Sequence, residues 1–269
     1  ESENQNSDQL PSNGPPEPGN KNARGKRTIV HVLASVSPDS GGPATVVGRR
    51  AASQAALGHQ VSIISTLAAN HRKSFEQSVA NVPGFDLVHL LLTPWATASQ
   101  QWFGTRLTHI FRTAFEHADV VHIHGIWEPM LIVAAACARR RGIPYVVRPC
   151  GMLDPWNLAQ RRWKKKVALS VTPHGMLNGA AFIHALNADE QRAIEPLNLW
   201  PPTRVVPNGV FTDEFRQLPP PGTFHRAHPE LAGRPYILFL SRLHPGKGLD
   251  HLGAAFPAVA RAVPDLQLV

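Results

Sequence analysis

Cysteine is scarce in this sequence, and acidic residues are outnumbered. Only two of the 269 residues are cysteine, which argues against a disulfide framework and makes a reducing cytoplasm the expected compartment. No apolar run is long enough to cross a bilayer, and no secretory signal opens the chain. The 27 Lys and Arg exceed the 19 Asp and Glu, giving a net charge of +8 that predicts an anionic partner.

Several ligand-binding motifs are also missing. There is no G-x-G-x-x-G dinucleotide fingerprint, and no Lys-Ser/Thr follows the glycine pair as in a P-loop. An Asp-x-Asp pair is absent, so we expect no bridging divalent metal and no bound cofactor. The positive charge comes without a nucleic-acid-binding motif, so nucleic acid is not an expected partner.

What the sequence does contain is a regular alternation of short apolar runs and longer helical patterns. This alternation predicts an α/β fold with a doubly wound parallel sheet. Residues 1–25 are rich in proline and polar residues, so we expect them to be disordered. The predicted strands are 28–34, 61–66, 85–91, 120–123, 143–148 and 181–186, and the main predicted helices are 44–57, 100–117 and 130–141.

Residues 234–252 predict a phosphate site. The apolar run 236–240 predicts a buried parallel strand, and a helical pattern begins at Leu249. Between them lie Arg242, which can grip two phosphate oxygens, and Lys247, a point charge near the helix N-terminus. The alternative is that both are ordinary solvated loop charges.

Residues 119–129 bring two histidines to the end of another predicted strand. His122 and His124 share one face because side chains alternate along a strand. We expect His122 to be a buried structural residue and His124 to be functional, because His124 ends the strand. The His-x-His pair could ligate a metal, but no acidic or Cys partner stands at a helpful spacing, so we expect none. Glu128 either stabilises the N-terminus of the next helix or binds a substrate hydroxyl.

The stretch 139–166 is strongly basic. It holds nine Lys or Arg against one acid, Asp154, and it includes Trp156 and Trp163. It could be a solvated face, a surface for anionic lipid, or a nucleic-acid surface that lacks its motif.

Several motifs together resemble glycosyltransferase family 4, the retaining enzymes with a GT-B fold. Ser241, Arg242, Leu243, Lys247 and Gly248 match one by one the family's pattern for holding the diphosphate of a nucleotide sugar. Residues 119–125, 149–155, 187–190 and 204–210 resemble further family elements in the right order. Cys150 departs from the pattern because relatives often carry Arg or His there, and Arg148 is the candidate for a displaced cation.

The resemblance implies roles for particular residues. The glycine-rich loop at Gly41 and Gly42 would lie near the reacting sugar, with Ser241, Arg242 and Lys247 on the donor phosphates. Arg242, Lys247 and His124 would be the catalytic group, and His124, Glu128 and Arg148 would lie on the acceptor side.

The expected reaction is transfer of a hexose from a nucleotide diphosphate sugar to a glycan or lipid-linked acceptor, with retention and without a metal. The expected regions are a disordered segment 1–25, an acceptor-side Rossmann-like domain 26–205, and the start of a nucleotide-sugar-binding domain 206–269. The rest of that domain, with the family's paired glutamates, would lie beyond residue 269, so the fragment alone would be inactive. Alternatives are a non-catalytic module that binds an anionic glycan or nucleotide, and a peripheral scaffold on the inner leaflet held by 139–166.

Overall fold

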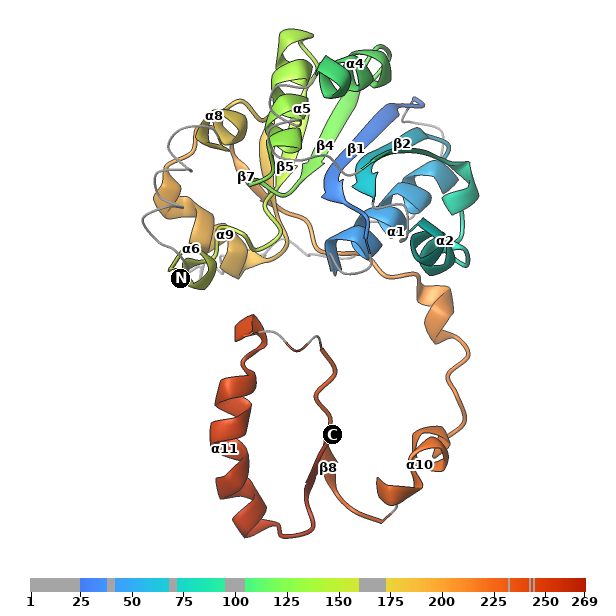
Figure 1. The fold of residues 1–269 in the computed structure, drawn as a ribbon, viewed down its shortest axis with the longest axis vertical. Helices are drawn as coiled ribbons and strands as arrows, with labels where there is room; N and C mark the ends of the chain where they lie inside the picture. Colours follow the sequence, from blue (N-terminus) through green and yellow to red (C-terminus); the bar gives the residue numbers. More distant parts are fainter. Residues whose placement is uncertain are drawn as a thin grey trace, which may run out of the picture. The chain divides into compact units, whose positions relative to one another are not determined.

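The computed structural model describes residues 25–37, 42–67, 72–94, 105–159, 173–231, 233–241, 243 and 245–269. Within these residues, seven strands join one sheet in the order β3-β2-β1-β4-β5-β6-β7 (Figure 1). The pairings β1–β2, β1–β4, β2–β3 and β6–β7 are parallel. The predicted α/β class is therefore confirmed. The strands are β1 Thr28–Ser35, β2 Gln60–Leu67, β3 Val88–Pro94, β4 Val120–His124, β5 Tyr145–Arg148, β6 Phe182–Ala185 and β7 Thr203–Val205.

The helices occupy most of the predicted positions. The predicted helix 44–57 is α1, and 130–141 is α5, each within two residues. The predicted helix 100–117 is represented by α4, and the start of its range lies outside the described residues. The helices are α1 Gly42–Ala56, α2 Arg72–Val79, α4 Thr105–Ala114, α5 Pro129–Arg140, α6 Pro155–Ala159, α8 Pro173–Asn178, α9 Ala188–Ile194, α10 Thr223–Ala227 and α11 Leu249–Ala262.

One strand begins later than predicted, and a glycine explains why. Residues 85–87 form a 3-10 turn, so β3 starts at Val88. Gly84 before the turn has φ 82°, and a Cβ built there would lie 2.9 Å from the backbone oxygen of Ala52. Only glycine fits this close approach to α1 without strain, so the chain turns here before it enters the sheet.

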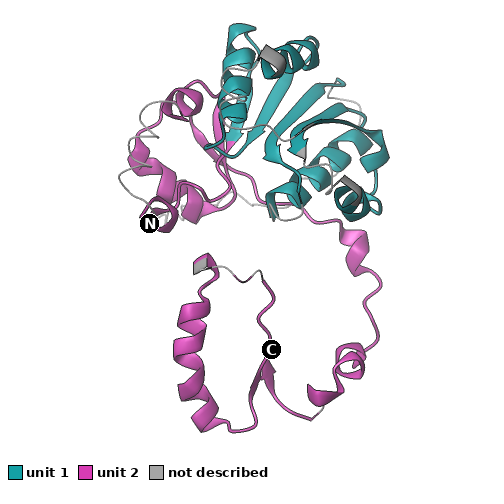
Figure 2. Cartoon of the chain, viewed as in Figure 1, with its two compact units in different colours: residues 1–147 teal, residues 148–269 magenta. Residues whose placement is uncertain are grey.

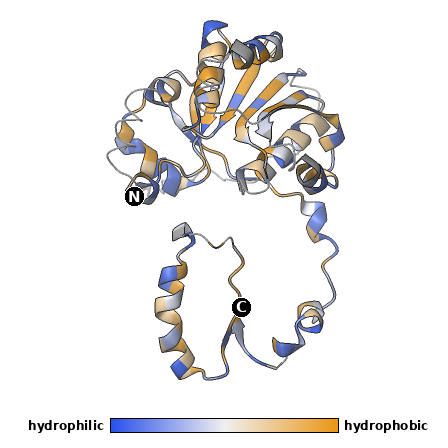
Figure 3. Ribbon diagram, viewed as in Figure 1, coloured by the Kyte–Doolittle hydropathy of each residue, from blue (hydrophilic) through white to orange (hydrophobic). Residues whose placement is uncertain are grey.

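The core forms around the strands that the sequence made most apolar. Figure 3 shows hydrophobic residues along the central strands, and Val32, Ile63 and Ile123 are fully buried there. Helices α1 and α2 contact each other, as do α4 and α5, and the two pairs lie on opposite sides of the sheet (Figure 1). This doubly wound arrangement buries the centres of β1 and β4 on both faces, including His31, His122 and His124.

The segment after β7 has little secondary structure. A second sheet contains β8 Tyr236–Ile237 and β9 Gln267–Leu268, paired in parallel. We expected a buried strand over 236–240, and this was wrong: Leu238 and Leu240 are exposed. Two short strands and α11 supply too few layers to cover an apolar strand.

The chain divides into two compact units, residues 1–147 and 148–269 (Figure 2). The sheet order nevertheless runs on to β7, so the predicted domain boundary after residue 205 stays a prediction. The predicted disorder of 1–25 falls almost wholly outside the described residues. Across the described part of the chain, no helix is both long enough and apolar enough to span a bilayer.

Candidate functional site

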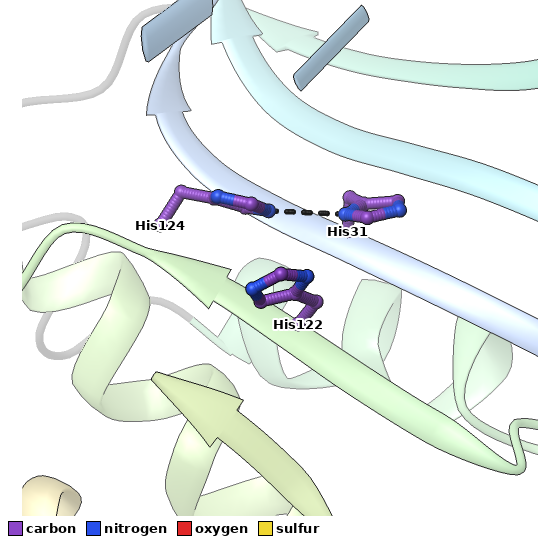
Figure 4. A group of neighbouring side chains, drawn as sticks. All are labelled: His31, His122 and His124. Atoms are coloured by element: carbon purple, nitrogen blue, oxygen red, sulfur yellow. Dashed lines mark hydrogen bonds between the residues drawn. The ribbon is translucent and has the colours of Figure 1, made fainter. Parts of the chain in front are cut away.

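Three histidines gather on one face of β1 and β4. His31 pairs with His122 in the parallel register, and His124 follows two residues later on the same face. The ring centroids of His122 and His124 are 4.2 Å apart, and each lies 5.3 Å from that of His31 (Figure 4). All three side chains are buried. The predicted common face of His122 and His124 is confirmed, and His31 is a third member that sequence reasoning missed.

A chain of hydrogen bonds orders these imidazoles. Nε2 of His31 lies 2.7 Å from Oε1 of Gln54 in α1, and its Nδ1 lies 3.0 Å from Nε2 of His124. Because the Gln54 oxygen only accepts, His31 Nε2 carries the proton. A neutral His31 then accepts at Nδ1, so His124 donates from Nε2, and a neutral His124 has an unprotonated Nδ1.

Burial favours this neutral state. Desolvation is the main cause that lowers the pKa of His31 from 6.5 to about 4. The hydrogen bond to Gln54 raises the pKa and the charge of Arg50 lowers it, both by less. His31 is therefore neutral near pH 7, which leaves the tautomer order intact.

The same cluster has the residue types of a metal site. One ligand nitrogen from each histidine lies within 4.8 Å of the others. A divalent ion would be held here by neutral ligands only, since no carboxylate belongs to the group. Two of the three residues, His31 and His124, share a hydrogen bond, and the expected absence of a metal stays a prediction.

Glu128 occupies the N-cap of α5, ahead of Pro129 at the first helical position. Its side chain makes no capping hydrogen bond, and both predicted roles of Glu128 stay predictions. Burial raises the pKa of the Glu128 carboxyl, and backbone N–H groups of Glu128 and Trp127 oppose this shift. Among the described residues, its buried Oε2 has no hydrogen-bond partner. A hydroxyl donor would satisfy this oxygen.

Arg148 ends β5 as a buried cation, with 2% of its surface exposed. Its Nη2 donates to Oδ1 of Asn208 at 3.0 Å. Nε and Nη1 have no hydrogen-bond partner in the described part of the chain.

The loop after Arg148 is held by a buried carboxylate. Gly151 N and Leu186 N each donate to Glu190 at 2.6 Å, one to each oxygen. Cys150 and Gly151 both have positive φ, 59° and 75°, so the chain turns sharply at the position where Cys150 departs from the family pattern. Burial raises the pKa of Asp154 in the same loop, and the charge of Glu190 raises it further.

The predicted donor residues are described only in part. Gly42 is the first residue of α1, and Ser241 and Lys247 are exposed near the start of α11. Gly41 and Arg242 lie outside the described residues. The diphosphate assignment therefore stays a prediction.

The basic stretch is likewise only partly described. Residues 139–141 are exposed at the end of α5, and Trp156 is exposed on α6. Residues 160–172, which hold most of the remaining charge and Trp163, lie outside the described range.

His31 and Gln54 are the residues that sequence reasoning missed. The signal available in the sequence was His31 itself, a polar residue inside the apolar run 28–34. Its pairing with His122 is known only from the structure. Gln54 gave no such signal, because a glutamine on a helix is ordinary.

Comparison with known proteins places this geometry in context. Residues 41–209, more than half of the chain, match the family model described as glycosyl transferase 4-like domain. A comparison with curated protein sequences finds no match.

Solved structures share the fold. Anabaena HepE, in complex with UDP and glucose, has a TM-score of 0.63 at 19% identity over 90% of this chain. The sucrose-phosphate synthase of Thermosynechococcus elongatus has a TM-score of 0.63 at 14% identity over 90%. A putative UDP-N-acetylglucosamine 2-epimerase of Listeria monocytogenes has a TM-score of 0.56 at 14% identity over 91%. The chain spans 60%, 61% and 62% of these three structures, and the expected GT-B fold class is confirmed.

Proposed function

The chain belongs to the glycosyl transferase 4-like domain family, and from this premise we propose that the whole protein transfers a hexose from a nucleotide diphosphate sugar to an acceptor hydroxyl. The acceptor would be a glycan or a lipid-linked glycan, and the anomeric configuration would be retained. The family match over 41–209 carries the proposal. The likeness to HepE, whose structure holds UDP and glucose, supports a nucleotide-sugar donor.

At the donor site, two cations would stabilise the leaving diphosphate. Breaking the sugar–phosphate bond leaves charge on the diphosphate, so fixed positive groups there stabilise the transition state more than the ground state. Arg242 and Lys247 would supply them, with Ser241 and the backbone of Gly41 and Gly42 as further contacts. Because no Asp-x-Asp pair is present, these two cations would take the place of a bridging metal.

On the acceptor side, the hydrogen bonds among Gln54, His31 and His124 would leave one His124 nitrogen as a hydrogen-bond acceptor. Gln54 and His31 fix His124 in the tautomer with an unprotonated Nδ1. Such a nitrogen accepts a hydrogen bond from an acceptor hydroxyl and orients it toward the anomeric carbon. Glu128, with its raised pKa, would bind a second hydroxyl.

Two other activities compete with transfer. UDP-N-acetylglucosamine 2-epimerases share the fold, so the fold by itself does not separate epimerisation from transfer. A binding module without turnover would use the same residues. The family match favours transfer over both.

A donor screen with full-length protein tests the proposal. Nucleotide sugars are incubated with and without glycan or lipid-linked acceptors, and both released nucleoside diphosphate and the donor sugar are followed. We expect diphosphate release that depends on acceptor, and a product whose anomeric configuration matches the donor by NMR. Recovery of the donor as its C2 epimer would replace transfer with epimerisation, and binding without any product would leave a binding module.

A further inference from the structure

Arg148 is the most unusual charged residue in the described chain. Its guanidinium is a planar cation with five N–H donors. Among the described residues, the guanidinium makes one hydrogen bond, from Nη2 to Asn208, while Arg148 is 2% exposed. Burying a cation with open donors is costly unless a partner arrives.

Among the described residues, no carboxylate forms an ion pair with Arg148. Both oxygens of Glu190 are engaged by the backbone N–H groups of Gly151 and Leu186. Asp154 has a raised pKa, mainly because it is buried. Asn208 offers Arg148 a neutral amide oxygen and no charge.

The open donors have the geometry of an oxyanion site. One proton of Nη2 goes to Asn208, which leaves one on Nη2, one on Nε and two on Nη1. Either Nε with Nη2 or Nη1 with Nη2 can grip two oxygens of one group, as guanidinium does with phosphate and carboxylate. The hydrogen bond to Asn208 fixes the orientation of the Arg148 guanidinium.

We propose that Arg148, positioned by Asn208, binds an oxyanion, and that this group belongs to the acceptor as a phosphoryl or carboxylate group. The assignment to the acceptor rests on the proposed function. The binding of the anion does not, because it follows from the buried guanidinium alone. The acceptor class is thereby narrowed to molecules that carry a negative charge.

A stability measurement separates a binding role from a structural one. If the open donors wait for a ligand, the anion-free protein carries an uncompensated buried cation. Arg148→Met then raises the thermal midpoint, because Asn208 is exposed and water replaces its lost partner. A purely structural arginine would give a lower midpoint in the same variant.

Anion binding is measured by the rise of that midpoint with inorganic phosphate or, separately, with acetate. All of these measurements start from one background variant that carries both Arg242→Ala and Lys247→Ala. This variant lacks the two cations proposed to bind the donor phosphates, so they cannot cause the rise. We expect at least one of the two anions to raise the midpoint of this background protein. The added Arg148→Met abolishes the rise, and Arg148→Lys weakens apparent affinity about tenfold or more, because the fork is lost. Arg192→Met, at an exposed arginine paired with Asp189, is the matched control and keeps the rise.

The outcomes are distinct. An equal midpoint rise in Arg148→Met and Arg192→Met, or a rise in none of the proteins, overturns the anion site. The anion that raises the thermal midpoint more, phosphate or acetate, identifies the class of oxyanion that Arg148 binds. Kinetics in the full-length protein then use two acceptors that differ only in that charged group, and Arg148→Met should raise KM for the charged one alone. If no acceptor is turned over but Arg148→Met still abolishes anion binding, the proposed function fails and the oxyanion site stands.

Discussion

Nδ1 of His31 lies 3.0 Å from Nε2 of His124, although 93 residues separate them in sequence. The contact exists because β1 and β4 are neighbours in parallel register. If His31 becomes protonated, its Nδ1 donates, and a neutral His124 then keeps the contact as the other tautomer, with its proton on Nδ1. The buried pair therefore links the tautomer of a proposed site residue to the pH of the solution.

Acid should destabilise the protein through His31. Its pKa in the folded chain is about 4, below the usual 6.5, so the unfolded chain binds more protons between these values. Stability is then fully present above pH 6.5 and falls as the pH drops toward 4, by on the order of 3 kcal/mol. Urea unfolding at pH 7.5 and 4.5 measures the difference. His31→Gln should shrink it, and His251→Gln, at an exposed histidine, should leave it unchanged. An equal pH dependence in all three proteins would show that His31 does not cause it.

Glu190 should matter for stability more than its place on the short α9 suggests. Its carboxylate accepts two backbone N–H groups while buried, and Asn187 caps the same helix by accepting from Glu190 N. Glu190→Gln turns an amide group toward one of these donors and should cost about 2 kcal/mol of unfolding free energy. The exposed Glu195→Gln should stay within about 0.5 kcal/mol. Denaturant unfolding of both variants compares them, and equal stabilities would remove the anchoring role.

Transfer should survive chelation. Two cations are proposed at the donor phosphates, and the histidine cluster is proposed to share a proton. Full-length protein dialysed against EDTA should therefore keep its rate. Loss of activity restored by magnesium or manganese would contradict the donor assignment. Restoration by zinc alone would place a metal on His31, His122 and His124.

The basic stretch predicts weak, salt-sensitive binding to anionic vesicles. Each Lys or Arg near an anionic surface contributes about 1 kcal/mol, so three productive contacts give reversible attachment. Changing residues 164–166 from Lys to Gln should lower co-sedimentation about tenfold or more at low salt. Changing Arg192, Arg216 and Arg226 to Gln removes the same charge elsewhere and should have little effect. Equal co-sedimentation of the protein with neutral and anionic vesicles would rule out an anionic membrane surface as a partner.

The sequence was most informative where one local pattern decided the outcome. The apolar strand 120–123 was placed to within a residue because its neighbours on both sides in the sheet are also apolar. The common face of His122 and His124 followed from the two-residue period alone.

Other features depend on long-range pairing that no local pattern encodes. His31 joins the cluster only through the β1–β4 register, and Gln54 joins it only through the packing of α1. The exposure of Leu238 and Leu240 was missed because an apolar run indicates burial without saying whether a covering layer is present. The hydrogen bond from Arg148 to Asn208 joins residues 60 positions apart in sequence, so no local pattern predicts it.

Transfer rates of full-length Arg242→Ala and Lys247→Ala test the proposed glycosyl transfer most directly. Each removes one preorganised cation from the leaving diphosphate, so each rate should fall roughly 100- to 1000-fold under saturating acceptor. Arg261→Ala, at an exposed arginine in the last turn of α11, is the matched control and should keep the wild-type rate. Wild-type turnover in Arg242→Ala or Lys247→Ala would contradict the diphosphate site and the transfer mechanism built on it.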